Sequence, residues 1–174
     1  YVYGPRGTKR FMREMLKTFV FVNKIKIEIK EILKEGKFID EKDFYLEAKK
    51  MFHGAPTLAY CFVKKGQLRI DKKKLEKSGL PHSPILQKLK HGKDVIFKGR
   101  KFRARDLTYM AEAKKICFVL DTKMNKNIVP FIKNSDLVVF ESSYADEDRG
   151  LASEHKHMTA KQVAESAKKA KVKK

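Results

Sequence analysis

Two carboxylates follow apolar segments of the sequence, where strands of an α/β protein usually end. Asp121 follows the apolar run 116–120, and Glu141 follows a second run, 137–140. Side chains at the carboxyl ends of strands in open α/β sheets converge on one crevice. Two carboxylates there could therefore bind a cation or transfer protons. The alternative interpretation is that Asp121 caps the turn that follows and that Glu141 is solvated.

Three histidines occupy positions where an imidazole could act. His53 precedes Gly54, so its ring could project from a tight turn and bind zinc as a neutral ligand. His155 and His157 lie just before a helix expected to begin after Thr159, where free backbone N–H groups attract phosphate. The two also form an H-x-H pair, which is a weak metal signal. A structural His53, and surface histidines in a polar loop, are the alternatives.

Hydrophobic periodicity predicts the elements that must position these side chains. The continuous run 116–120 is typical of a strand covered on both faces. Thr8 is expected to cap a helix with apolar positions Phe11, Met15 and Phe19, and Thr159 to open another with a capping box. The further predicted strands are 25–29, 44–48, 57–63 and 137–140, and the further predicted helices are 71–77, 85–90 and 125–132.

Composition limits the function classes. The chain has 174 residues, and 41 Lys and Arg against 21 Asp and Glu give it a formal net charge of +20. With 42% hydrophobic residues it is too apolar for a disordered tail and long enough to bury a core. A pI near 9.9 favours a polyanionic partner, of which nucleic acid is the usual soluble one. A generally lysine-rich proteome is the alternative.

The two cysteines and the apolar runs bear on location. Cys61 and Cys117 are the only cysteines and lie inside apolar runs, so a disulfide framework is not expected. Free thiols favour a reducing cytosol. No apolar run reaches the ~18 residues of a membrane span, and we expect a cytoplasmic protein with no membrane partner.

Most of the excess charge lies in one segment. Residues 64–105 carry fifteen Lys and Arg but three acidic residues, which is typical of an arm outside the core. Its aromatics, Phe62, Phe97 and Phe102, lie near its ends, so recognition of RNA backbone and shape is expected rather than base stacking. A solvated lysine-rich loop is the alternative. The candidate RNA-binding residues are Lys72, Lys73, Lys74, Lys77, Lys88 and Lys90.

In this order, the motifs resemble ribonuclease Z, the tRNA 3′-processing endonuclease with a metallo-β-lactamase fold. Val-Tyr-Gly-Pro-Arg-Gly-Thr resembles its strand–turn–helix segment, and Phe-His-Gly resembles its zinc-binding histidine segment. Leu-Asp-Thr, Phe-Glu-Ser-Ser and His-Met-Thr resemble its Gly-Asp-Thr, His-Glu-Ala-Thr and His-Ser-Thr segments. The basic segment lies where the family inserts a flexible tRNA-binding arm. The five matching segments are residues 2–8, 52–54, 120–122, 140–143 and 157–159.

The resemblance implies an α/β fold that is part of a metallo-β-lactamase αββα sandwich with an inserted basic arm. Residues 1–63 would form the first part of the core, 64–105 the tRNA-binding arm and 106–174 the second part of the core. The implied partners are precursor tRNA and a second copy of the chain in a homodimer. Two zinc ions per intact active site are implied, and no small-molecule cofactor.

The resemblance also implies roles for the site residues. Asp121 would bridge the two zinc ions, and His53 would ligate one of them. His157, oriented by Glu141, would be catalytic by stabilising the transition state or protonating the leaving oxygen. The implied reaction is hydrolysis of precursor tRNA after the discriminator nucleotide, which removes the 3′ trailer and leaves a 3′-hydroxyl.

Part of the family pattern is missing. The His-x-His-x-Asp-His motif that supplies most zinc ligands does not occur in the sequence, and the last histidine ligand would follow Lys174. We therefore expect a central fragment, with activity only in the intact protein. A non-catalytic, basic RNA-binding module is the alternative, which zinc titration distinguishes. A hydrolase of small esters is disfavoured because such a substrate gains nothing from the basic arm.

Overall fold

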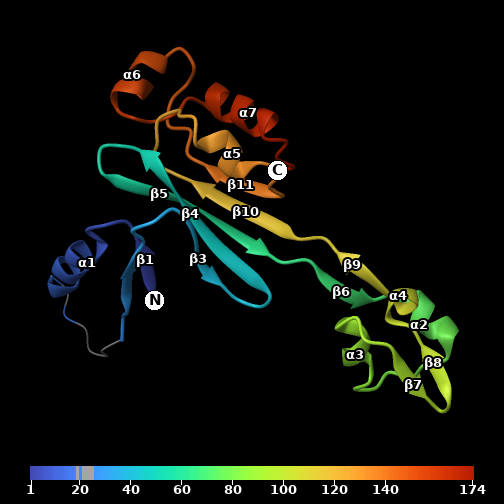
Figure 1. The fold of residues 1–174 in the computed structure, drawn as a ribbon. Coiled ribbons are helices and arrows are strands. Elements are labelled where there is room, and N and C mark those ends of the chain that lie inside the picture. Colours follow the sequence, from blue (N-terminus) through green and yellow to red (C-terminus); the bar gives the residue numbers. More distant parts are fainter. Residues whose placement is uncertain (19, 21–25) are drawn as a thin grey trace. The chain divides into compact units, whose positions relative to one another are not determined.

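A computed structural model describes residues 1–18, 20 and 26–174 (Figure 1). The chain divides into two compact units, which are described separately. The core unit comprises Tyr1–Val63 and Lys115–Lys174, and the basic unit comprises Lys64–Lys114. The basic unit begins at the first residue of the expected arm and continues beyond residue 105, where the arm was expected to end.

The core unit is built around a five-stranded sheet with the strand order β11-β10-β5-β4-β3. Strands β10 and β11 are parallel, and β3 and β4 are antiparallel. A separate parallel pair, β1 and β2, lies near the amino terminus. The elements are β1 (Val2–Gly4), α1 (Thr8–Lys17), β2 (Ile29–Glu31), β3 (Gly36–Asp40), β4 (Phe44–Phe52), β5 (Pro56–Lys64), β10 (Lys114–Val119), α5 (Ile128–Ile132), β11 (Leu137–Phe140), α6 (Arg149–Glu154) and α7 (Ala160–Lys169).

One face of the sheet is covered by helices. Val119 on β10 is fully buried and packs in the same cluster as Ile128 and Ile132 of α5. Met158 and Ala170, which flank α7, belong to the same cluster. Figure 1 shows α5 and α7 beside the sheet. The expected capping box is confirmed, because the Thr159 hydroxyl accepts from the backbone of Gln162 and the Gln162 side chain accepts in return. Capping satisfies free N–H groups and thereby defines where α7 begins.

The other face of the sheet is open, which contradicts the expectation that strand 116–120 is covered on both faces. Phe118 and Val139 are aligned neighbours on β10 and β11, and they are 43% and 38% exposed. Leu120 and Leu137 are exposed to a similar degree. These four apolar residues are named here the exposed sheet face. Nothing in the described chain covers them fully.

A carboxylate, not the expected hydroxyl, caps helix α1. Thr8 is the first helical residue, and its hydroxyl donates to the carbonyl of Pro5 (2.6 Å). Glu31 Oε1 accepts from the backbone N–H groups of Lys9 (3.0 Å) and Gly7 (2.9 Å). The bond from Lys9 is the main cause that lowers the pKa of the Glu31 carboxyl. The prediction that Thr8 caps the helix is therefore wrong.

The other predictions for this region are met only in part. Phe11 and Met15 lie on α1 as predicted, but both side chains are exposed. Phe19 and Ile25 lie outside the described residues. Ile27 is exposed and precedes the short strand β2. Among the described residues of the predicted strand 25–29, Ile29 alone lies in a strand.

The two cysteines form a disulfide, contrary to the expectation of free thiols. Cys61 on β5 and Cys117 on β10 are fully buried, and their sulfur atoms are bonded. The strands are neighbours in the sheet, which brings the two Cα atoms to 4.1 Å. Residue counts could not reveal this pairing, because it depends on which strands become neighbours. Because the two cysteines are bonded, the sequence argument that free thiols favour a reducing compartment no longer applies.

The basic unit has a hydrophobic core of its own, which the abundance of charge and turn residues had not predicted. Leu75 and Leu89 are fully buried in it, together with Phe102 and Leu107. Among the described helices of the chain, none is both long and apolar enough to cross a bilayer. The elements of the basic unit are β6 (Gln67–Ile70), α2 (Lys72–Ser78), α3 (Leu86–Lys90), β7 (Val95–Phe97), β8 (Arg100–Phe102), α4 (Ala104–Leu107) and β9 (Thr108–Ala111).

Substitutions at adjacent positions of β10 should distinguish the two faces of the sheet. Phe118→Thr keeps a strand-forming side chain on the open face, and we expect it to change the free energy of unfolding by less than about 1 kcal/mol. Val119→Ala opens a cavity in the helix-covered core and should cost about 2 kcal/mol. Urea unfolding measures both, and a larger loss for Phe118→Thr would show that this face is covered.

Candidate active site

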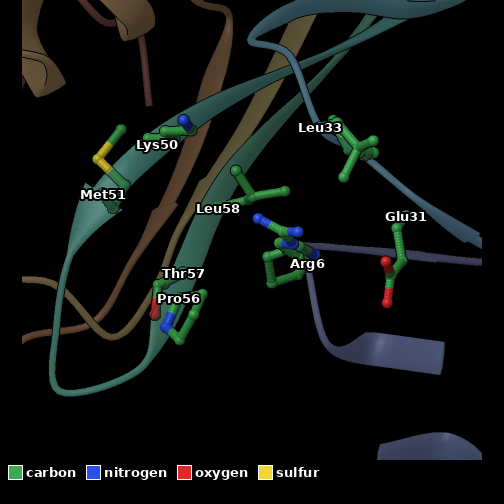
Figure 2. A pocket seen from close by; sticks show the side chains of 10 residues that line it. Arg6, Glu31, Leu33, Lys50, Met51, Pro56, Thr57 and Leu58 are labelled. Carbon is green, nitrogen blue, oxygen red and sulfur yellow. The ribbon is translucent and has the colours of Figure 1, made fainter. Parts of the chain in front are cut away.

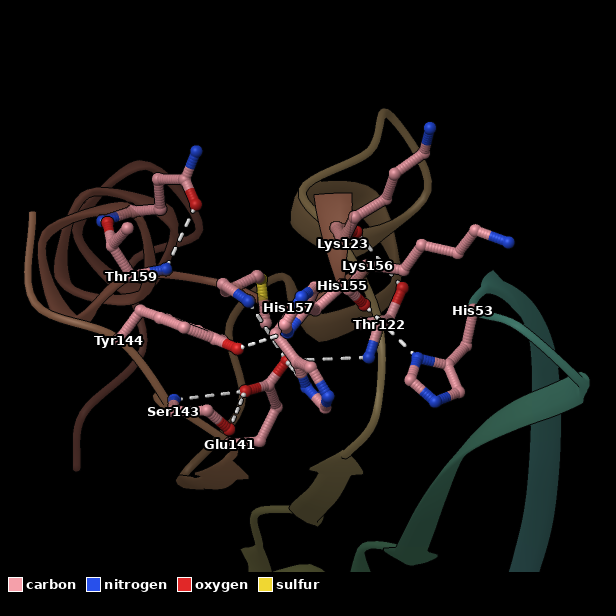
Figure 3. Close-up of polar contacts among 12 residues, drawn as sticks. His53, Thr122, Lys123, Glu141, Ser143, Tyr144, His155, Lys156, His157 and Thr159 are labelled. Atoms are coloured by element: carbon pink, nitrogen blue, oxygen red, sulfur yellow. Dashed lines mark hydrogen bonds and ion pairs between the residues drawn. The ribbon is translucent and has the colours of Figure 1, made fainter. Parts of the chain in front are cut away.

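The carboxylate of Glu141 lies at the centre of the candidate site (Figure 3). Glu141 follows β11, and its backbone N–H donates to the carbonyl of Val119 (3.2 Å), so the ends of two parallel strands fix its position. The side chain is only 9% exposed. Oε1 accepts from the backbone N–H of Met158 (3.0 Å), and Oε2 accepts from the backbone (3.2 Å) and hydroxyl (2.9 Å) of Ser143. A solvated Glu141 is therefore excluded.

His157 is oriented by this carboxylate. Its Nδ1 lies 3.2 Å from Oε1 of Glu141, and the His157 side chain is 23% exposed. An ionised carboxylate only accepts hydrogen bonds, so Nδ1 carries the proton and Nε2 is the free ring nitrogen. The segment that carries His157 is held beside Glu141 by a β-bridge between Tyr144 and Thr159. This arrangement gives His157 a defined tautomer and a nitrogen that a reactant can reach.

His53 lies beside His157, as Figure 3 shows, although 103 residues separate it from its hydrogen-bond partner Lys156. Its Nδ1 is 3.2 Å from the carbonyl oxygen of Lys156, and the centroids of the two histidine rings are 5.0 Å apart. A carbonyl also only accepts, so Nε2 of His53 is likewise the free nitrogen in the neutral ring. A backbone carbonyl on the other ring nitrogen is the usual support of a metal-binding histidine.

The buried side chain of Thr122 connects the loop after β10 to the loop that carries His53. Its hydroxyl accepts from the backbone N–H of Phe52 (3.0 Å) and from the side chain of Asn125 (3.1 Å). The backbone N–H of Lys123 donates to the carbonyl of Phe52 (2.9 Å). The backbone N–H of Thr122 also donates to Glu141 (3.4 Å), so this single residue links the end of β4 to the central carboxylate.

Asp121 is not part of this network. It is exposed, its backbone has a φ of 46°, and its carboxylate has no hydrogen bond or ion pair within the described residues. No turn-capping contact is found for it either. Nowhere in the described part of the chain do three or more His, Cys, Asp or Glu residues come together as a metal site. Among the described residues, His53 and Asp121 thus lack the further ligands of a complete zinc site.

The polar loop after Glu141 contributes side chains that residue types alone did not indicate. The Tyr144 hydroxyl lies 2.7 Å from Nδ1 of His155, and its ring centroid is 6.1 Å from that of His157. Ser143 supplies two of the donors to Glu141. The sequence signal that could have revealed Ser143 is its hydroxyl, two residues after the carboxylate of Glu141. The two histidines of the H-x-H pair therefore have different hydrogen-bond partners.

A cavity of about 630 Å³ lies in the core unit beside the loop that carries His53 (Figure 2). Met51 precedes this loop and Pro56 follows it, and both line the cavity. Arg6 also lines it, and Glu31 contributes the carboxylate that caps α1. Neither Glu141 nor His157 lines this cavity, so it borders the candidate site without containing it.

The predicted RNA-binding lysines are on the surface of the basic unit. Four project from α2 and two from α3, and all six side chains are exposed. The helices are anchored by the buried Leu75 and Leu89, and the lysines occupy exposed positions around these anchors. The residues are Lys72, Lys73, Lys74, Lys77, Lys88 and Lys90.

Solved structures identify the class of fold. Human tRNase Z, short form, matches 99% of this chain with a TM-score of 0.62, at 19% sequence identity and over 57% of its own length. The metallo-β-lactamase fold protein YhfI of Bacillus subtilis matches 98% of the chain and 48% of its own length, with a TM-score of 0.54 and 13% identity. The chain has the metallo-β-lactamase fold, as the resemblance implied.

Sequence comparison then gives the particular relatives. A ribonuclease Z of Nanoarchaeum equitans is 34% identical over 91% of this chain, and one of Oceanobacillus iheyensis is 32% identical over 99%. The chain spans 49% and 58% of these proteins, about half of their length. No protein-family profile matches the chain. The resemblance is confirmed: the chain is homologous to ribonuclease Z over nearly all its residues.

Removing the central carboxylate should loosen the site. Glu141→Ala deprives the Met158 and Thr122 amides of their acceptor, and we expect faster amide hydrogen exchange at both. The lost bonds to a charged acceptor should lower the free energy of unfolding by about 2 kcal/mol. Glu154→Ala, at an exposed glutamate of α6, is the control and should change neither quantity. Unaltered exchange at Met158 in Glu141→Ala would contradict the hydrogen-bond network.

Proposed function

We propose that the chain is part of a zinc-dependent endoribonuclease that removes 3′ trailers from precursor tRNA. The observation that carries the proposal is the Glu141–His157 pair beside His53, in a chain homologous to ribonuclease Z. Cleavage would occur after the discriminator nucleotide and leave a 3′-hydroxyl. Because the chain spans about half of its relatives, this activity is proposed for the longer polypeptide.

In this proposal His157 acts as a general acid. The hydrogen bond from Nδ1 to Glu141 leaves Nε2 as the nitrogen that donates a proton to the leaving oxygen. The negative carboxylate stabilises the charged imidazolium that precedes donation. Hydrogen bonds from Ser143 and the Met158 amide compensate the burial of the Glu141 carboxylate.

The zinc ions are part of the proposal, and the described residues fit them only in part. The carbonyl-supported ring of His53 has the chemistry of a zinc ligand, and Asp121 is an exposed carboxylate. A catalytic zinc needs about three protein ligands, and the described residues form no cluster of three such side chains. The missing ligands would come from the part of the relatives that the chain does not cover. When bound, zinc would supply an activated water as nucleophile.

The exposed sheet face supports the view that the proposed enzyme is larger than this chain. Phe118, Leu120, Leu137 and Val139 form one apolar surface on β10 and β11. In the proposed αββα sandwich, a second sheet would pack against this face and bring further ligands to the site. A homodimer and a cytoplasmic location are also part of the proposal and are supported by the resemblance to ribonuclease Z.

The basic unit would bind the tRNA. Lysines on α2 and α3 displace counterions from phosphate groups, an interaction that depends on charge rather than sequence. The unit has its own hydrophobic core, so it can present these lysines on a folded surface. In this proposal the basic unit binds the substrate, and the Glu141–His157 pair takes part in cleavage.

A non-catalytic RNA-binding module is the second candidate. It is favoured by one observation: the described residues form no cluster of three or more metal-ligating side chains. Zinc titration of the longer polypeptide separates the candidates, because the enzyme should bind about two ions tightly. Zinc-dependent cleavage of a 3′-extended precursor tRNA at the discriminator supports the enzyme. Salt-sensitive tRNA binding without zinc binding or cleavage would overturn it.

Neutralising lysines of α2 should weaken tRNA binding. For the variant Lys72→Gln/Lys73→Gln/Lys77→Gln, we expect the slope of log affinity against log salt concentration to fall by about two. A matched control in the core unit is Lys133→Gln/Lys168→Gln/Lys169→Gln, which removes equal charge. Filter binding with precursor tRNA measures both. Equal effects of the two triple variants would contradict a specific role of α2.

A further inference from the structure

The two-stranded ribbon of β6 and β9 in the basic unit carries an exposed tyrosine. The strands are antiparallel, and Arg69 is paired with Tyr109, so both side chains lie on the same face of the ribbon. Tyr109 is 51% exposed. Within the described residues, its ring has no aromatic or cation–π partner. About half of the residue's surface is therefore accessible to a ligand.

The tyrosine lies in a shallow pocket of about 390 Å³ that is rich in positive charge. Four of the residues that line the pocket are basic, and one is acidic. The basic unit as a whole has sixteen Lys and Arg against five acidic residues, so its charge does not cancel this local excess. The residues that carry the argument are Lys64, Lys65, Arg69, Tyr109, Glu112 and Lys114.

We propose that this pocket binds an unpaired nucleotide of RNA, with its base stacked on Tyr109 and its phosphates beside Arg69 and Lys64. The inference rests on the proposed function and extends it, because it assigns a base-stacking site to the basic unit. A single-stranded nucleotide combines a flat apolar surface with a negative charge, and the pocket offers a partner for each. In a duplex the bases are stacked on each other and could not reach the ring.

The sequence had suggested a different mode of binding. The expected arm ended at residue 105, and its aromatics Phe62, Phe97 and Phe102 lie near its ends, so stacking was not predicted. The basic unit extends to Lys114 and thereby includes Tyr109. Phe102 is buried in the core of this unit, whereas Tyr109 is exposed. The aromatic residue suited to stacking lies on the strand that had been assigned to the core.

Affinity for single-stranded RNA tests the proposal in the full 174-residue chain. The probes are a short oligouridylate and an abasic oligomer of the same length, which has the same phosphates but no bases. We expect Tyr109→Leu to bind oligouridylate about tenfold more weakly and Tyr109→Phe to bind it normally. The abasic oligomer should bind all three proteins equally. Tyr1→Leu, which removes an exposed tyrosine of the core unit, should have no effect.

A direct readout is available because the chain has no tryptophan. In Tyr109→Trp the single indole reports on its own contacts, and stacking with a base should quench its fluorescence. We expect oligouridylate to quench it and the abasic oligomer and a polyglutamate peptide to leave it unchanged. Quenching by polyglutamate as strong as by oligouridylate would overturn the assignment to RNA and indicate an acidic peptide.

The outcomes separate this inference from the proposed function. Suppose the wild-type chain binds tRNA in a salt-sensitive way but binds oligouridylate and the abasic oligomer equally. The proposal of a stacking site is then wrong, whereas the RNA-binding role of the basic unit is retained. Equal binding of oligouridylate by Tyr109→Leu and the wild type would also contradict the stacking site alone. If the chain binds neither tRNA nor oligouridylate, both the RNA-binding role and this inference are wrong.

Discussion

The candidate site depends on one buried carboxylate that must be satisfied by hydrogen bonds. Glu141 accepts from Thr122, Ser143, His157 and Met158, which lie in three separate loops. Leaving such a charge unpaired in the interior costs several kcal/mol, so the loops are held together wherever Glu141 is ionised. The orientation of His157 and the position of the loop that carries His53 follow from this requirement.

The two units of the chain solve different physical problems. In the core unit, helices cover one face of the sheet, and the polar site forms where β10 and β11 end. The basic unit buries leucines such as Leu75 and Leu89 in its own core and can therefore carry a large excess of lysine on its surface. In the proposed ribonuclease, substrate positioning would need many weak charge contacts, whereas bond cleavage would need a few fixed groups. Two separately packed units would meet both needs.

Local patterns predicted the parts of the structure that local interactions determine. Strands β4, β5, β10 and β11 follow from apolar periodicity, and the capping box of α7 from Thr159 and Gln162. Glu141 and His157 were candidates because of their places after a strand and before a helix, and the structure brings the two side chains together. The disulfide, the open face at Phe118 and the partners of Glu141 depend on which segments become neighbours, and single-sequence patterns do not contain that information. Asp121 precedes Thr122 of the network, and its role as a zinc ligand stays a prediction.

The tautomers of the two histidines test the account most directly. At a pH where both rings are neutral, a long-range ¹H–¹⁵N spectrum identifies which nitrogen of His53 and of His157 carries the proton. We predict protonated Nδ1 on both rings, because the Glu141 carboxylate and the Lys156 carbonyl can only accept. Both free Nε2 atoms are then available for chemistry. Protonation of His157 at Nε2 would mean that Glu141 does not orient it, and the proposed site would be wrong.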